Sequence, residues 1–161
     1  MVTIQKGDYY FEVDLEKTID YYKTHTLCEC DYCQNFYAQI KGKFPKLESF
    51  LSDFGVDISK PDEITSAESE NAVMYISIDY TVCGKVVAKA QEPIEMQDDI
   101  FFRLAITDGF VSPNEQAGDY FTISVNNIFT LPWVLDKPFP TPAQRQPLSR
   151  IKCFLKKIFK A

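Results

Sequence analysis

Three of the five cysteines and the only histidine fall in one short stretch, from His25 to Cys33. Thiolate and imidazole groups are the ligands that zinc prefers in proteins. Cys30 and Cys33 have the C-x-x-C spacing that lets two sulfurs share one tetrahedral ion, and Cys28 and His25 are near enough to supply two more ligands. The stretch therefore predicts a metal site made by Cys28, Cys30, Cys33 and His25, with zinc as the metal.

The same cysteines fit two other interpretations. Small, polarisable cysteines also pack well where a helix begins after a loop, and Asn35 would then satisfy loop carbonyls. A C-x-x-C pair can also do redox chemistry, but no predicted strand leads into it, as one does in a thioredoxin-type unit. Strong zinc signatures have two separated pairs, whereas Cys83 and Cys153 are single residues. Packing at a helix junction is therefore the simplest interpretation, with metal binding and redox use as alternatives.

The residues of an enzyme site are hard to find in this sequence. One histidine without a serine or cysteine nucleophile motif is a poor catalytic set, and His25 is more simply a solvated residue at the end of a helix. The chain has no Gly-rich phosphate loop and no H-E-x-x-H motif. We expect a non-enzymatic protein, without an organic cofactor.

The location of the protein follows from its hydropathy. No apolar run opens the chain, and no window approaches the ~20 apolar residues of a membrane span. We expect a cytoplasmic protein with reduced thiols or metal-bound thiolates. Cys28 and Cys30 are too close for a comfortable disulfide, and a Cys28–Cys33 bridge would close a very small loop.

The charge is unevenly distributed along the chain. Residues 1–136 carry 10 Lys and Arg against 23 Asp and Glu, a net −13, whereas residues 137–161 carry 7 basic residues and no acidic one, a net +7. An acidic body argues against nucleic acid as a partner and favours a basic protein. The loop between the helical and sheet halves is especially acidic, with Asp57, Asp62, Glu63, Glu68 and Glu70.

The first half of the chain predicts a hairpin and three helices. Strands around Lys6-Gly7-Asp8 form the hairpin over residues 2–13. Asp14 caps a helix that runs to about Lys23. The buried face of this first helix is expected to be Leu15, Ile19 and Tyr22. A second helix begins with an Asp31–Gln34 capping box and stops at Gly42. A third helix begins at Pro45, and its buried residues are Leu47, Phe50, Leu51 and Phe54.

The second half predicts strands. Residues 72–82 alternate, with Met74, Ile76, Ile78 and Tyr80 on one face, and a turn or bulge at Cys83-Gly84 leads into residues 85–90. Residues 100–107 and 120–129 are two further strands. Helices followed by a meandering sheet indicate a single α+β domain over residues 1–138, with a mostly antiparallel sheet.

Residues 139–161 form the second predicted segment, a Pro-rich linker followed by a basic amphipathic helix. The helix would dock its apolar face on the domain itself, or residues 149–161 would bind an anionic membrane surface. Its apolar residues are Leu148, Ile151, Phe154, Leu155 and Ile158.

Three motifs carry a resemblance to known proteins. They are C-x-C-x-x-C-x-N-F from Cys28, G-V-D-I-x-K-P ending at Pro61, and L-P-W-V-L-D-x-P from Leu131. With them, residues 1–138 resemble a group of small uncharacterised proteins, mainly from Gram-positive bacteria. The resemblance implies a bacterial cytoplasmic domain and carries no activity with it.

The main hypothesis from the sequence is a non-enzymatic module that binds a basic protein through an acidic surface, as an inhibitor or immunity-type protein does. The alternatives are a small metal-binding protein whose cysteine site is structural or regulatory, and peripheral attachment to a membrane through the basic tail.

Overall fold

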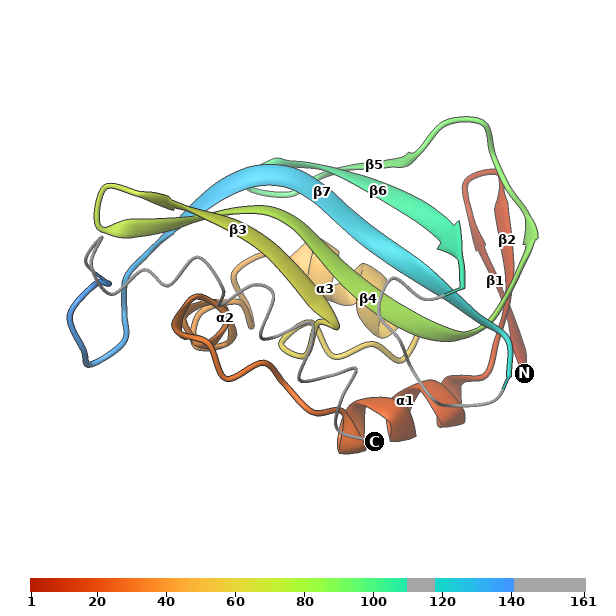
Figure 1. Ribbon diagram of the computed structural model, residues 1–161. Helices are drawn as coiled ribbons and strands as arrows, with labels where there is room; N and C mark the ends of the chain where they lie inside the picture. The colour runs from red at the N-terminus through yellow and green to blue at the C-terminus, as the bar shows by residue number, and fades with distance from the viewer. Residues whose placement is uncertain (110–117, 141–161) are drawn as a thin grey trace.

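The computed structural model describes residues 1–109 and 118–140 and confirms the α+β fold. Its seven strands form one antiparallel sheet, and three helices cover one face of that sheet (Figure 1). The elements are β1 (Val2–Lys6), β2 (Tyr9–Val13), α1 (Leu15–Thr24), α2 (Asp31–Tyr37), α3 (Pro45–Ser52), β3 (Glu63–Ser69), β4 (Ala72–Ala88), β5 (Ile94–Gln97), β6 (Phe101–Asp108) and β7 (Tyr120–Pro132).

The long strand β4 organises the sheet. The strand order is β1-β2-β4-β7-β6-β5, and β3 also pairs with β4. On the edge of β4 opposite β7, β3 covers residues 72–79 and β2 covers residues 84–88. Between these two partners the edge of β4 is covered by α1, by Asp14 just before α1 and by Asp62 just before β3, through hydrogen bonds to Thr81 and Cys83.

Helix α1 begins as predicted, because the Asp14 side chain accepts a hydrogen bond from the Lys17 N–H at 3.0 Å. Its predicted buried face was partly wrong. Thr18, Tyr21 and Tyr22 are buried, whereas Ile19 is 44% exposed. The helix is rotated so that polar groups meet the open edge of β4, a requirement that hydrophobic spacing alone does not reveal.

The predicted capping box of α2 was wrong. The N-cap residue is Cys30, no side chain caps the helix, and the Gln34 amide donates to the Glu29 carbonyl at 2.9 Å instead. The helix ends at Tyr37, before the predicted stop at Gly42. Only two turns are formed, so the position of α2 depends on packing rather than on capping.

Helix α3 matches its prediction closely. Pro45 occupies its first turn, and Leu47, Phe50 and Leu51 are buried. Phe54 follows directly, fully buried, with its ring edge-on to Phe11 at 5.1 Å between centroids. This apolar stripe therefore docks the helical layer on the sheet.

The face of β4 that meets the core was predicted incorrectly before Ser77. A bulge between Tyr75 and Ser77 shifts the register, so Val73 and Tyr75 are buried in place of Met74 and Ile76. After the bulge, Ile78 and Tyr80 face the core as expected. One extra residue in a strand reverses the alternation on one side of it.

Two strands were not predicted. Glu63–Ser69, interpreted as part of an acidic loop, is β3, and Ile94–Gln97 is β5. β3 has only two apolar residues among charged and small polar ones, and β5 alternates apolar and polar residues over only four positions. Pairing with β4 and β6 forms these strands, and it overrides their weak local preference.

The predicted C-terminal helix falls on residues 141–161, outside the described residues. Within the described ranges, no helix combines the length and apolar character needed to cross a bilayer.

Candidate metal centre

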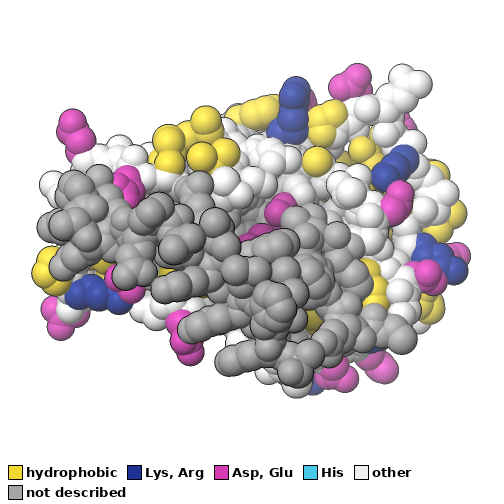
Figure 2. All heavy atoms as spheres, in the orientation of Figure 1, with side chains coloured by type: hydrophobic (Ala, Val, Ile, Leu, Met, Phe, Trp, Pro, Cys, Tyr) yellow, Lys and Arg dark blue, Asp and Glu magenta, His cyan; other side chains and the backbone are white. Residues whose placement is uncertain are grey.

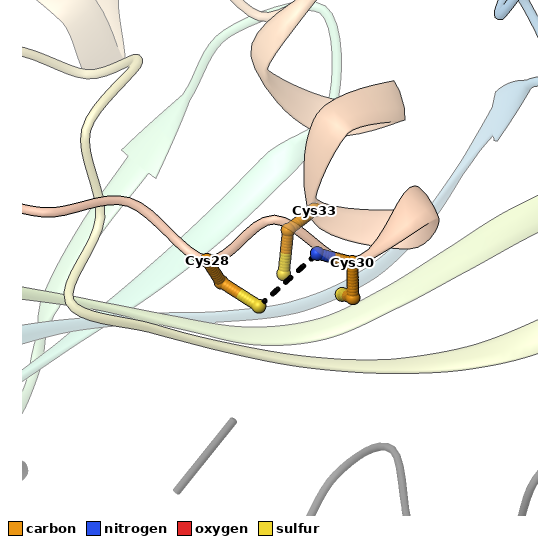
Figure 3. Close-up of side chains that lie close together, drawn as sticks. All are labelled: Cys28, Cys30 and Cys33. Atoms are coloured by element: carbon orange, nitrogen blue, oxygen red, sulfur yellow. Dashed lines mark hydrogen bonds between the residues drawn. The ribbon is translucent and has the colours of Figure 1, made fainter. Parts of the chain in front are cut away.

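The cysteine site lies where the segment after α1 turns into α2 (Figure 3). Cys28 belongs to the extended segment before the helix, Cys30 is the N-cap residue, and Cys33 lies in the first turn. The backbone N–H of Cys30 donates to the sulfur of Cys28 at 3.5 Å. The turn of the chain thus places three cysteines from six consecutive positions on one side of the helix start.

The three sulfur atoms all lie within 4.8 Å of one another, the one such group of potential metal ligands within the described residues. In a tetrahedral zinc site with Zn–S bonds of about 2.3 Å, ligand sulfurs are about 3.8 Å apart. Small side-chain rotations of Cys28, Cys30 and Cys33 would therefore close the group around one ion. Three of the four predicted ligands therefore lie close together.

The sulfurs differ in exposure and in acidity. Cys33 is buried and Cys30 is half-buried. A hydrogen bond from the Cys33 thiol lowers the pKa of Cys30 to about 7, and the same interaction, together with burial, raises the pKa of Cys33. Cys30 is therefore the group that ionises first, and it supplies a thiolate near neutral pH without help from a metal.

Two phenol groups lie beside the sulfurs. Burial raises the pKa of Tyr37, and the neighbouring Cys33 raises it further. Burial likewise raises the pKa of Tyr75, whose hydroxyl donates to the Tyr32 carbonyl at 2.8 Å. Both phenols therefore remain protonated at neutral pH. Neither phenol was predicted to lie beside the cysteines.

Cys28 differs in oxidation state from Cys30, Cys33 and Cys83. Cys30, Cys33 and Cys83 are free thiols, as expected, whereas Cys28 is disulfide-bonded. Its bridge is to neither Cys30 nor Cys33, which agrees with the short spacings that made those two bridges unfavourable. A three-thiolate site therefore requires Cys28 in its reduced form.

His25, the fourth predicted ligand, lies elsewhere and is not part of the sulfur group. Its side chain is only 8% exposed, so the expectation of a solvated histidine was wrong. The Nε2 atom is 3.2 Å from the Pro61 carbonyl oxygen, and Nδ1 is 3.8 Å from the carboxylate of Asp62. The ring also packs on Tyr21, which leaves His25 as part of a buried polar cluster beside β4.

Asn35 connects the cysteine stretch to the end of β7. Its amide donates to the Pro132 carbonyl at 3.1 Å and accepts from the Val134 N–H at 2.9 Å, as expected for a residue that satisfies loop carbonyls. An ion pair between Lys137 and Asp31 adds a second link. Two of the three sequence motifs, almost 100 residues apart, thus meet at the start of α2, so the site is held from both sides.

Comparison with protein-family models, with curated proteins and with solved structures found no match to this chain. The resemblance to a group of Gram-positive bacterial proteins stays a prediction, and the geometry of the three cysteines is the basis for a functional proposal.

Proposed function

We propose that this chain is a small metal-binding protein in which Cys28, Cys30 and Cys33 hold one zinc ion. The observation that carries the proposal is the separation of the three sulfurs, none more than 4.8 Å from another. Zinc prefers thiolate ligands, and three of them leave one of its four positions for another donor. The lowered pKa of Cys30 helps, because the ligand must lose its proton before it binds.

The role of the ion would be structural or regulatory. Cys28 and Cys30 belong to the segment that leads from α1 into α2, and Cys33 belongs to α2 itself. A shared ion would fix this segment to the first turn of a helix that has no side-chain cap. Binding to the folded state alone stabilises a protein by about 4 kcal/mol at 1,000 times the dissociation constant.

The proposal is tested on full-length protein purified with a phosphine reductant and without chelator. Elemental analysis should give about one equivalent of zinc, and replacing the zinc with Co²⁺ should produce sulfur-to-metal charge-transfer absorption. Cys28→Ser, Cys30→Ser and Cys33→Ser should each lower the zinc content. Cys83→Ser is the control, because Cys83 is a buried thiol of β4 outside the group. Less than about half an equivalent in the reduced wild-type protein would reject the proposal.

A second candidate function is the binding of a basic protein, and a pocket favours it. A cavity of about 680 Å³ at the β3–β4 turn is lined by two carboxylates and an aromatic ring. A Lys or Arg side chain would find both an opposite charge and a ring face there. The lining residues are Glu68, Ser69, Glu70, Asn71 and Phe139.

On the face of the molecule that Figure 2 shows, the acidic side chains do not gather into one docking surface. Figure 2 shows Asp and Glu side chains spread around the visible surface, with Lys and Arg beside several of them. The pocket is therefore the specific place to test. Binding of a synthetic arginine-rich peptide, measured by calorimetry, should weaken in Glu70→Gln and with added salt, and stay unchanged in Glu92→Gln, an exposed control. Equal binding by both variants would count against this site.

A further inference from the structure

We infer that metal-free Cys30 and Cys33 form a redox-active dithiol that exchanges with disulfides. This activity goes beyond the proposed metal binding, because it uses two sulfurs and no ion. The geometry that points to it is the pairing of a half-buried cysteine at the N-cap with a buried cysteine one turn further, their sulfurs within 4.8 Å (Figure 3). Disulfide exchange by a dithiol needs such an arrangement, because one sulfur must attack the disulfide from solution and the other must resolve the mixed disulfide.

The difference in exposure assigns the roles. A disulfide from solution can reach the Cys30 sulfur more easily than that of Cys33, which is only 7% exposed. Cys33 is then protected from direct attack by reagents but lies close enough to react with anything attached to Cys30. Exchange depends on access to the attacking sulfur as well as on its chemistry.

The steps balance with a low-molecular-weight disulfide, RSSR, as the oxidant. The Cys30 thiolate attacks one sulfur of RSSR, so that a mixed disulfide forms and RS⁻ leaves. Cys33 then gives up its proton and attacks the Cys30 sulfur, which forms the Cys30–Cys33 disulfide and releases a second RS⁻. The dithiol loses two electrons and two protons, and RSSR is reduced to two RSH.

The oxidation state of Cys28 makes the two functions alternatives. Where Cys28 is disulfide-bonded, only two of the three sulfurs are thiols, and the three-thiolate site is not available. The remaining pair is the dithiol. Once the Cys30–Cys33 disulfide forms, it removes two ligands at the same time, so metal binding and disulfide exchange exclude each other.

The test uses the reduced full-length chain, stripped of metal by a chelator and incubated with oxidised glutathione. The remaining thiols are then alkylated, and mass spectrometry should find the Cys30–Cys33 disulfide. Cys83 should stay a thiol during the oxidation and so carry the alkyl group, which makes it the internal control. Cleavage after Glu29 separates Cys28 from the pair. A wild-type chain that keeps Cys30 and Cys33 as thiols under these conditions would overturn the inference.

Variants separate the two roles. Cys33→Ser should accumulate the glutathione adduct on Cys30 at least about tenfold above the wild-type level, since nothing resolves it. Cys30→Ser should form little adduct on the buried Cys33, and equal adduct in all three chains would contradict the assignment. The oxidation is repeated in Cys28→Ser, which lacks the three-sulfur site, so that the result does not depend on zinc. Formation of the Cys30–Cys33 disulfide in this variant supports the redox-active dithiol, and failure to form it contradicts the inference.

Discussion

The carboxylate of Asp62 accepts a hydrogen bond from the backbone N–H of Thr81 at 2.8 Å, in the place where a neighbouring strand would otherwise pair with β4. The Tyr21 hydroxyl donates to the other oxygen of the same carboxylate. At the same position on the edge of β4, the Tyr22 hydroxyl donates to the Thr81 carbonyl at 2.9 Å. The side chains of α1 and of Asp62, the residue before β3, thus satisfy an edge that β2 and β3 leave uncovered.

Replacing Asp62 with Ala should therefore destabilise the fold. Asp62 is only 6% exposed, and its loss leaves the Thr81 N–H and the Tyr21 hydroxyl buried without their acceptor. We expect a loss of about 2–4 kcal/mol, measured by urea denaturation. Asp136→Ala, at an exposed position, should change stability by less than about 0.5 kcal/mol. Similar small effects for both variants would mean that water replaces the Asp62 carboxylate.

Thr18 supplies the next part of this edge. Its hydroxyl accepts from the Cys83 N–H at 3.1 Å and donates to the Asp14 carbonyl at 2.8 Å, and the residue is fully buried. Thr18→Val keeps the shape and removes both bonds, so we expect a loss of about 1–3 kcal/mol. Thr18→Ser keeps the hydroxyl and should lose less. If Ser destabilised more than Val, packing of the methyl group, rather than hydrogen bonding, would explain the role of Thr18.

These contacts show where sequence reasoning reached its limit. The α3 stripe and the α+β class were predicted because hydrophobic spacing within one element decides them. The contacts that cover the edge of β4 were not predicted, because Thr18, Asp62 and Thr81 are polar residues from distant parts of the chain. Asp62 was interpreted as one acid of the loop between the helical and sheet halves, and only the fold shows that it is buried.

In the candidate site, too, local features could be predicted from the sequence and tertiary ones could not. Cys28, Cys30 and Cys33 were correctly grouped, because a span of six residues at a helix start cannot separate them widely. His25 was grouped with them on sequence distance alone. The extended backbone at this helix C-cap residue and its contacts with Pro61 and Asp62 keep His25 out of the sulfur group, a result of tertiary packing.

Gly84 is the position at which β2 joins β4, and it has no room for a side chain. Its φ angle is +151°, and an added Cβ would lie 2.2 Å from the Glu12 carbonyl oxygen. Gly84→Ala should therefore cost more than about 3 kcal/mol. Gly7→Ala is the matched control, since Gly7 also has a positive φ, +59°, but no atom near the added Cβ; about 1 kcal/mol is expected there. Thermal unfolding of both variants compares the two costs, and equal losses would show that the close contact relaxes freely.

The reactivity of Cys30 should depend on pH in a way that reports its contact with Cys33. Because the Cys33 thiol lowers the pKa of Cys30 to about 7, Cys30 is mainly protonated and unreactive below that pH and mainly thiolate above it. In the reduced, metal-free chain, the rate of iodoacetamide alkylation at Cys30 should therefore rise with a midpoint near pH 7, followed by mass spectrometry of the separated peptides. Cys33→Ala removes the donor and should move the midpoint up towards about 8.5, the value of an ordinary cysteine.

Cys83, whose pKa burial raises, should react slowly across the whole range and serves as the internal reference. A midpoint near 8.5 in both chains would show that the two sulfurs do not interact, and the roles assigned to Cys30 and Cys33 in disulfide exchange would then rest on exposure alone.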